Sequence, residues 1–282
     1  MAGRLFAALQ YVLPKYLLTT LIYHVARVRT VSFKNWLITR FAKAYKVNLD
    51  EVAAKVPDDF ATFNDFFIRE LRDGERPIDA DESSIVSAAD GRLSQFGTVS
   101  HGTIVQAKGR DYRVDELLAV DLETAASYEG GCFATVYLAP YNYHRVHAPV
   151  DGRLVAAHYV PGDLFSVNAA TAQYVPGLFR RNERLNLHFD TDNGQCMVSL
   201  VGALNVGSIS TPWSGEIRPR SKGVVESLSL DRHPVDVRKG DLLGWFNMGS
   251  TVVMLTQNVA FDDALTPDMT VRMGERLGAR KQ

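Results

Sequence analysis

The sequence predicts an α+β protein in which N-terminal amphipathic helices precede a mainly antiparallel β body. Two observations support this prediction. Up to about residue 71, apolar residues recur every three to four positions, which is the spacing of one helix face. From residue 86 onward, short runs rich in Val, Leu, Phe and Tyr alternate with Gly, Pro, Asp and Asn, which is typical of an antiparallel sandwich or barrel. The 282 residues are 46% hydrophobic, enough for a sizeable core.

The first predicted elements form a basic arm of amphipathic helices. In LFAALQYVLPKYLLTTLIYHVARV, the apolar residues at helical spacing are Leu5, Leu9, Val12, Leu13, Tyr16 and Leu17. In SFKNWLITRFAKAYKV, the apolar residues Phe33, Leu37, Phe41 and Tyr45 stand four apart, with Lys34, Arg40, Lys43 and Lys46 largely on other faces. Residues 1–49 contain eight Lys and Arg and no Asp or Glu, although the whole chain has a net charge of −1. This asymmetry indicates an anionic partner, either nucleic acid or a membrane surface.

The apolar content of the arm favours a membrane surface and not nucleic acid. No uncharged apolar run reaches the roughly 18 to 20 residues that span a bilayer, because Pro14, Lys15 and Arg27 interrupt the arm. No small-residue cleavage site of a signal peptide follows Leu13. We therefore expect the arm to lie in the membrane interface, attached peripherally to the cytoplasmic face of the cell membrane. The alternative is a helical hairpin packed on its own domain or on a second subunit.

The body begins after one further helix. TFNDFFIRELRDGERPID predicts a helix with Phe63, Phe66, Phe67 and Leu71 on one face, closed by Gly74 and Pro77. The predicted strands are 92–98, 131–138, 152–160, 185–190, 196–206, 215–219, 223–229 and 251–257, with a helix near 114–127. We divide the chain into a helical region, 1–85, and a β-rich catalytic domain, 86–282. Within that domain RKGDLLGWF, residues 238–246, resembles the turn-strand pattern of lipoyl-type domains.

Three short stretches carry the residues that could perform chemistry. Gly249 and Ser250 interrupt an apolar run, Asp90 stands at the head of a predicted strand, and His144 and His147 lie in YNYHRVHAP. Taken singly, each has a structural explanation as a bulge, a turn or a core histidine. A serine nucleophile would need a base and a group that orients the base, and Asp90, His144 and His147 are the candidate partners for Ser250.

The same residues do not make a complete metal site. Two histidines three apart would share a face if a turn of helix follows Pro140, but zinc needs a third ligand and no second cluster has metal spacing. The only cysteines, Cys132 and Cys196, are too few for a thiolate zinc site or a secreted disulfide framework. We therefore predict no metal and a reducing compartment.

The chain resembles the bacterial phosphatidylserine decarboxylases, which are membrane-associated, self-processing, pyruvoyl-dependent enzymes. The resemblance runs from the N-terminal helices to about residue 260 and rests on the order and spacing of LQYVLPK, TFNDFF, LRDGERPID, ADG, QAKG, YHRVHAP, YVPGDLFSVN, LFRRNER and KGDLLGWFNMGSTV. One position departs from the family. Its usual Leu-Gly-Ser-Thr reads Met-Gly-Ser-Thr at residues 248–251 here, a nearly volume-conserving change.

The resemblance implies that the chain cuts itself between Gly249 and Ser250. Ser250 Oγ attacks the Gly249 carbonyl, and β-elimination then separates fragments 1–249 and 250–282. The second fragment begins with a pyruvoyl group derived from Ser250, and the two fragments form a heterodimer that assembles into a further homo-oligomer. His147 resembles the family's base and Asp90 its orienting carboxylate. Glycine at 249 suits this reaction because it has no Cβ and tolerates a strained backbone.

The resemblance also implies the reaction catalysed after cleavage. The pyruvoyl group forms a Schiff base with phosphatidylserine, takes up the electrons left by departing CO2, and yields phosphatidylethanolamine. His144 is the predicted acid that returns a proton to the α-carbon, and Phe165 and Ser166 are predicted to line the headgroup pocket. Three alternatives remain: a pyruvoyl decarboxylase of a soluble amino acid, a non-catalytic lipoyl-like carrier or binding module, and a zinc hydrolase using both histidines.

Overall fold

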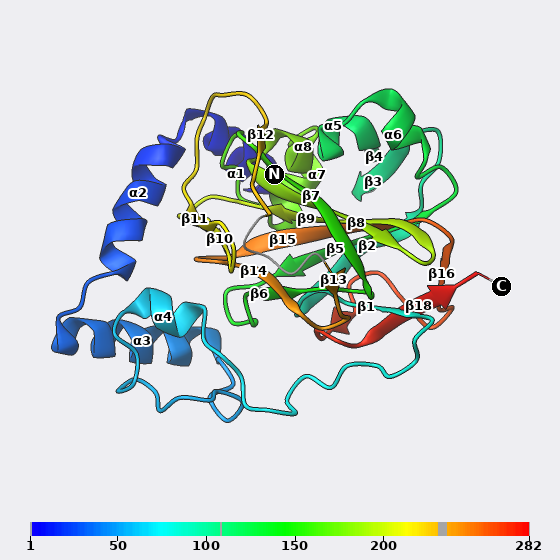
Figure 1. The fold of residues 1–282 in the computed structure, drawn as a ribbon. Coiled ribbons are helices and arrows are strands. Elements are labelled where there is room, and N and C mark those ends of the chain that lie inside the picture. Colours follow the sequence, from blue (N-terminus) through cyan, green and yellow to red (C-terminus); the bar gives the residue numbers. More distant parts are fainter. Residues whose placement is uncertain (1, 108, 231–235, 282) are drawn as a thin grey trace.

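The protein consists of a helical arm and a β body, as the computed structural model in Figure 1 shows. The structure describes residues 2–107, 109–230 and 236–281. The arm contains α1 (Ala2–Val12), α2 (Lys15–Ala26) and α3 (Val31–Tyr45). Helices α1 and α2 meet at 88°, with Leu13 and Pro14 at the break. The ring of Pro14 fixes its φ and removes a backbone donor, which favours a break at this position.

The arm turns its apolar stripe away from the body. Leu5, Val12, Leu17 and Leu21 are 73%, 77%, 68% and 58% exposed. The buried residues of α1 and α2 are Ala7, Gln10, Lys15, Thr19 and Ala26, of which Ala26 packs in the cluster that α3 and α4 (Phe63–Phe67) form. In the described part of the chain, no single helix is long and apolar enough to cross a membrane; α1 and α2 reach that length and composition only when counted together.

Helix α3 buries a different face from the one its sequence pattern suggests. Its buried residues are Lys34, Ile38 and Ala42, whereas Phe33, Leu37 and Phe41 are only half-buried. Lys34 was predicted on the polar side but is buried. Its Nζ donates to Pro57 O at 3.2 Å and to Asn35 Oδ1 at 2.7 Å, and these bonds compensate for the burial. A buried ammonium group requires such partners.

A nine-stranded antiparallel sheet forms the centre of the body. Eight of its strands follow the order β12 (Glu226–Ser227), β7 (Gly152–Val160), β8 (Arg184–Thr191), β9 (Gly194–Val201), β15 (Ser250–Thr256), β5 (Cys132–Leu138), β2 (Gly91–Thr98) and β17 (Thr270–Val271); the ninth, β13 (Asp236–Val237), also pairs with β7. All seven residues of β15 are buried. The C-terminal part of the chain therefore contributes a central strand.

Smaller sheets and short helices surround the central sheet. A second sheet has the order β11 (Gly215–Ile217), β10 (Ile209–Thr211), β14 (Leu242–Phe246), β6 (Arg145–His147). A third has the order β1 (Ser84–Val86), β18 (Arg276–Arg280), β16 (Val259–Phe261), and β3 (Thr103–Ala107) pairs with β4 (Arg110–Arg113). The short helices are α4 (Phe63–Phe67), α5 (Val114–Leu118), α6 (Leu122–Ala126), α7 (Ala169–Tyr174) and α8 (Leu178–Arg181).

The predicted α+β class with a mainly antiparallel body is confirmed, and the barrel alternative is wrong for the described residues. In the order of the central sheet, β12 and β17 are the two ends, and they do not pair with each other, so the sheet stays open. The predicted helix 114–127 is two helices, because Ala119 adopts φ 56° and ends α5. The run 223–229 pairs only at residues 226–227, and the run 196–206 ends as a strand at Val201.

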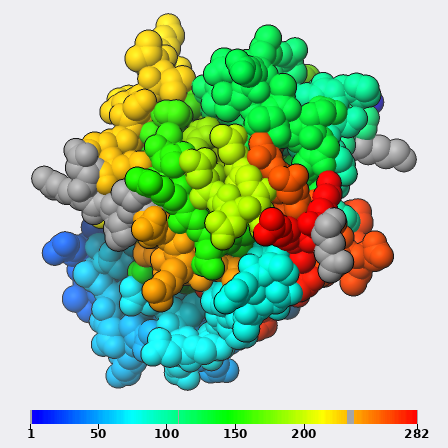
Figure 2. Space-filling view, turned by 45° about the vertical axis from the view of Figure 1, so that its right-hand side comes forward, coloured from blue at the N-terminus to red at the C-terminus, as the bar shows by residue number. Residues whose placement is uncertain are grey.

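Two hydrophobic clusters stabilise the fold. The larger lies within the body and includes Ala7 of α1. The smaller joins α3, α4 and residues 47–60, and Met248 packs against it. In Figure 2, the light-blue to cyan segment that follows α3 covers the lower part of the visible face. The division between residues 85 and 86 stays a prediction.

Candidate active site

The stretch Gly249-Ser250 lies at the entrance to the central strand. Ser250 is the first residue of β15 and pairs with Leu138 of β5. Its Oγ is buried and has no hydrogen-bond partner among the described residues. The pocket beside it has a volume of about 210 Å³ and is lined by residues of six segments: Phe41, Tyr45, Phe67, Tyr137, Leu138, Pro140, Ser166, Val167, Asn168, Ala203, Leu204, Asn205, Met248, Gly249 and Ser250.

The backbone at Gly249 does not use the conformational freedom that glycine offers. Its φ lies outside the left-handed region that favours glycine. A Cβ at this position would lie 3.7 Å from Leu138 O and 3.9 Å from His144 Nε2, both ordinary van der Waals distances. There is room for a methyl group, so the fold does not require glycine here. A methyl group at this position would, however, be in contact with His144 Nε2.

His144 faces the Gly249-Ser250 peptide. Its Nδ1–H donates to Asn142 O at 2.8 Å, which leaves Nε2 as a bare acceptor. That Nε2 is buried and unpartnered within the described chain. Burial, with a smaller contribution from the Arg69 guanidinium, lowers the pKa of His144 to about 3. The imidazole is therefore neutral and holds a free lone pair beside the peptide.

His147 lies on β6 and is engaged elsewhere. Its Nδ1–H donates to Gly240 O at 2.8 Å, and Tyr143 O–H donates to its Nε2 at 3.1 Å. Burial lowers its pKa. Because His144 precedes β6 and His147 ends it, the two rings do not share a helix face, which the sequence pattern had suggested. The structure brings His144, and not His147, to the peptide before β15.

Asp90 is buried directly before β2, and both oxygens of its carboxylate accept hydrogen bonds. It accepts from Arg76 Nε at 2.8 and 3.0 Å, from Arg76 Nη2 at 2.6 Å and from Met273 N–H at 2.9 Å. The next position, Gly91, requires glycine because a Cβ there would come within 2.4 Å of Tyr137 O on the neighbouring strand. No hydrogen bond joins Asp90 to His147 in the described structure, although the carboxylate is close enough to favour the charged imidazole.

The loop Gly162–Asn168 contributes unequally to the pocket. Ser166 lines the pocket, whereas Phe165 is completely buried and turns toward the arm. The Phe165 ring lies 5.0 Å from the Tyr11 ring and 3.7 Å from Lys15 Nζ. Of the two predicted headgroup contacts, only Ser166 borders the cavity in this conformation.

The arm supports the pocket through contacts that sequence patterns did not reveal. Gln10 Oε1 accepts from Ser166 N–H at 3.1 Å, and Thr19 Oγ1 accepts from Asn205 N–H at 3.1 Å. Lys15 Nζ pairs with Asp163 at 2.8 Å. One sequence feature could have indicated these contacts. Gln10 and Lys15 lie in largely apolar helices, and a polar side chain that is buried needs a hydrogen-bond partner.

The described residues contain no group of three or more His, Cys, Asp or Glu that could hold a metal ion. Cys132 and Cys196 are both buried and unpaired with each other.

Comparison with known proteins assigns the chain to a family. The sequence model of phosphatidylserine decarboxylase matches residues 63–279, and a second family model, described as PSD, matches residues 5–46. The chain belongs to the phosphatidylserine decarboxylase family. Asp90, His144, His147, Ser166 and Ser250 all lie inside the first matched region. The resemblance read from the motifs is thus confirmed.

Relatives in the phosphatidylserine decarboxylase family match almost end to end. A phosphatidylserine decarboxylase proenzyme of Pseudomonas aeruginosa is 47% identical over 99% of this chain and 98% of its own length. Proenzymes of the same name from Alcanivorax borkumensis and Saccharophagus degradans are 45% and 42% identical over 98% of this chain, and the matches cover 96% and 98% of their own lengths.

Proposed function

We propose that this protein is a phosphatidylserine decarboxylase that converts phosphatidylserine to phosphatidylethanolamine and CO2 after cutting itself between Gly249 and Ser250. One observation carries the proposal: the Ser250 hydroxyl and the bare His144 Nε2 are both buried and unpartnered within the described chain, at the same peptide. An unpartnered buried polar group costs stability, so its retention calls for a role. The word proenzyme in the relatives' names supports a processed chain.

The proposed cleavage uses only groups of this chain and one water. Ser250 Oγ loses its proton and bonds to the Gly249 carbonyl carbon, while the peptide C–N bond breaks and the nitrogen of residue 250 takes a proton. Loss of the Cα proton of residue 250 then expels the Gly249 carboxylate from Cβ. The dehydroalanine left at residue 250 adds water and releases ammonia, which produces the pyruvoyl group.

His144 supports the first step because its Nε2 lies beside Gly249 and has no hydrogen-bond partner in the described structure. The lone pair of this Nε2 can accept the Ser250 proton. Burial lowers the pKa of this imidazole and so makes it a weaker base than an exposed histidine. We propose that His147 and Asp90 have supporting, structural roles. His147 holds the loop before β6 in place through Tyr143 and Gly240. Asp90 holds the start of β2 in place through Arg76. The family role of His147 as base requires it to exchange these partners.

The pocket fits the cofactor that would form at residue 250. Once formed, the pyruvoyl carbonyl supplies an electron sink for loss of CO2 from a bound amino acid headgroup. The pocket residues Ser166, Asn168 and Asn205 offer polar contacts to that headgroup, while Phe41, Tyr45 and Phe67 form an aromatic part of the wall. His144 Nε2 stays beside Gly249 and can return a proton to the product once it has taken one up.

The two fragments would remain associated after cleavage. Fragment 250–282 includes β15, which pairs with β5 over seven residues and with β9 over six. A central strand held on both sides does not leave a folded sheet. A homo-oligomer of this heterodimer stays a prediction.

The arm supports peripheral membrane attachment, which we propose at the cytoplasmic face. Its outward stripe of leucine and valine residues can bury in the interface, while the arm's basic residues are attracted to anionic lipid. Phe41 and Tyr45 of α3, the third helix of the arm, form part of the pocket wall, so the arm borders the pocket. We propose that a headgroup reaches residue 250 from the leaflet along this side.

The first test is an intact mass of the purified protein under denaturing conditions, beside a Ser250→Ala control. We expect two fragments, one ending at Gly249 and one beginning with a pyruvoyl group, and a single uncut chain for the control. The processed protein should release CO2 from phosphatidylserine vesicles and not from free serine. A single uncut chain from the native sequence would contradict self-cleavage; CO2 from free serine would instead favour the soluble amino acid decarboxylase.

A further inference from the structure

The residue before Met248 lies in a buried polar network that extends to the arm. Asn247 is buried, and its backbone N–H donates to Ser208 O at 3.1 Å. Its Nδ2 donates to Ser208 Oγ at 2.7 Å and to Ser210 Oγ at 3.0 Å, and its Oδ1 accepts from Asn64 Nδ2 at 3.0 Å. The side-chain amide thus joins α4 to β10 on either side of the segment that leads to Gly249.

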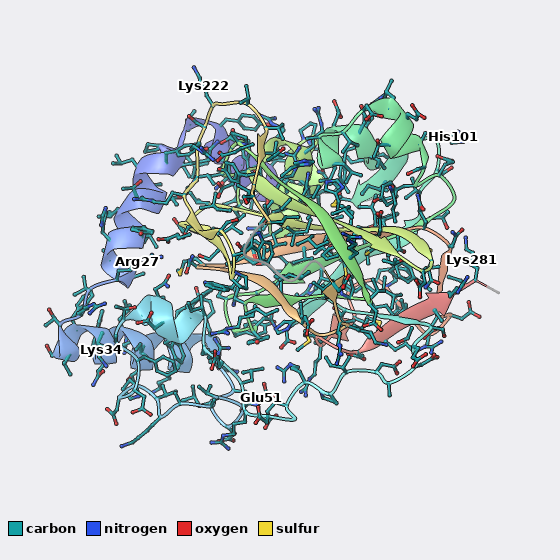
Figure 3. All side chains as sticks on the ribbon, in the orientation of Figure 1. Arg27, Lys34, Glu51, His101, Lys222 and Lys281 are labelled. Atoms are coloured by element: carbon teal, nitrogen blue, oxygen red, sulfur yellow. The ribbon has the colours of Figure 1, made fainter. Side chains whose placement is uncertain are left out.

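The network continues from β10 to the end of α2. Ser208 Oγ–H donates to Glu216 Oε1 on β11, and Arg27 Nη2 donates to the same oxygen at 2.6 Å. Tyr23 O–H donates to the other carboxylate oxygen at 3.0 Å. In Figures 1 and 3, the end of α2 that carries Arg27 lies beside β10 and β11.

The segment between Asn247 and Ser250, the two residues held by hydrogen bonds, is short. On its upstream side, Phe246 N–H donates to His144 O at 3.1 Å and Asn247 is held as described above. On its downstream side, Ser250 is paired with Leu138. Only Met248 and Gly249 lie between these anchors, so the position of Asn247 decides how the Gly249 carbonyl is presented to Ser250 Oγ.

We propose that Asn247 is a positioning residue for self-cleavage and that α2 acts on the cleavage segment through Arg27, Glu216 and Ser208. This inference rests on the proposed self-cleavage at Gly249-Ser250. Attack on a carbonyl needs the two atoms held near contact distance in the correct direction, and a displacement of about 1 Å can cost roughly a hundred-fold in rate. Asn64, Asn247, Ser208 and Ser210 are buried, so loss of one of them leaves its partners without a hydrogen bond. The link from Ser208 through Glu216 to Arg27 is partly exposed and therefore weaker.

The main experiment compares Asn247→Ala with Asn186→Ala. Asn186 is the matched control, since it is also buried, donates to Leu117 O and Leu118 O, and accepts from Ser199. Full-length chains are made by cell-free translation, and the appearance of the two fragments is followed by intact mass. We expect Asn247→Ala to slow cleavage by about ten- to a hundred-fold and Asn186→Ala to leave it within about two-fold. Unfolding of both variants, measured with Ser250→Ala added, monitors stability without cleavage.

A second readout separates positioning from general damage. Once the Asn247→Ala chain has cut itself, its decarboxylase activity per pyruvoyl group should stay within about three-fold of the unchanged protein, because the network acts on the uncut peptide. A purely structural defect lowers both the cleavage rate and the activity per pyruvoyl group.

The link to the arm is tested with Arg27→Gln and the control Arg29→Gln, which removes the same charge from an exposed position two residues away. Because a partly exposed ion pair contributes little, we expect Arg27→Gln to slow cleavage by about two- to five-fold and Arg29→Gln to have no effect. Equal rates for these two variants would overturn the coupling to α2.

The positioning role is overturned if Asn247→Ala cleaves at the unchanged rate, or if Asn186→Ala slows cleavage as much. Both outcomes leave the proposed function intact, because the native chain still cuts itself. If the native chain does not cut itself, the proposed function fails and this inference fails with it.

Discussion

At the scale of single residues, the surroundings of Ser250 distinguish it more than its own burial does. Thr251 and Thr256 on the same strand also have buried hydroxyls without a partner in the described structure. Ser250 alone among these follows the glycine whose Cβ position lies 3.9 Å from His144 Nε2. The ring of His144 is held by Asn142 O and by the Phe67 ring, whose centroid is 4.1 Å away. The unpartnered Nε2 of His144 therefore distinguishes the reactive position, because an unpartnered hydroxyl also occurs at Thr251 and Thr256.

This geometry separates the roles of the two histidines. We expect His144→Gln to slow self-cleavage by on the order of a hundred-fold, since glutamine preserves hydrogen bonding but cannot take the Ser250 proton. His147→Gln should slow it by less than about ten-fold, because both His147 nitrogens already have partners. Fragment formation by mass measures both. If His147→Gln blocks cleavage and His144→Gln does not, His147 reaches Ser250 in another conformation and is the base that the family resemblance implies.

At the scale of elements, the arm serves two sides of the molecule. Its outer stripe is free to meet a membrane, while Gln10, Lys15 and Thr19 hold the loops that line the pocket. Helix α3 supplies Phe41 and Tyr45 to the pocket wall. Deleting residues 1–45 would therefore remove a proposed membrane anchor and part of the pocket together, and single substitutions are needed to tell them apart.

We expect the two sides of the arm to respond to different changes. Replacing Leu5, Leu17 and Leu21 with serine should abolish sedimentation with anionic vesicles but preserve decarboxylation of a short-chain, soluble phosphatidylserine. Gln10→Ala with Lys15→Met should do the reverse, lowering kcat/KM for the soluble lipid by about five- to twenty-fold, since loss of one or two partly buried polar contacts costs about 1 to 2 kcal/mol. If the leucine substitutions leave vesicle binding unchanged, the arm is not the membrane anchor.

At the scale of the whole molecule, buried ionisable groups give stability opposite dependences on pH. Burial lowers the pKa of His144 to about 3 and that of His188 to about 4, so these residues reduce stability as the pH falls below about 6.5. Burial raises the pKa of Glu183 to about 7. The native state therefore holds the Glu183 proton more tightly than the unfolded chain, and stability falls as the pH rises from about 4.5 to 7.

We expect Glu183→Gln to remove the second of these dependences. Glutamine stays neutral at every pH and keeps an acceptor for Tyr159 O–H, which donates to Glu183 at 2.7 Å. Measured by urea unfolding in the Ser250→Ala background, the variant should gain nothing at pH 4.5 and on the order of 3 kcal/mol at pH 8. The difference between the two proteins cancels the histidine contribution. Exposed Glu82→Gln is the control, and a gain that does not change with pH would contradict the buried-carboxyl explanation.

The sequence by itself determined the class of the fold, the helical arm, most strands of the central sheet and the family. These depend on local spacing: amphipathic periods predict α1 to α3, and apolar runs between turn residues predict β2, β5, β7, β8 and β15. The position of the Gly249-Ser250 motif before a buried strand was also readable from local sequence.

Only the tertiary structure decided which side chains meet. The register of β15 on β5 and of β14 on β6 brings His144 to Gly249 and directs His147 to Gly240, although the two histidines are three positions apart. The helical period predicted which residues of α1 and α2 form the apolar stripe, but not whether that stripe faces the body or solvent. The side that faces the body is fixed by polar partners in distant loops, such as Ser166 and Asp163. Contacts between residues far apart in sequence depend on the packing of the whole chain, and no local pattern encodes them.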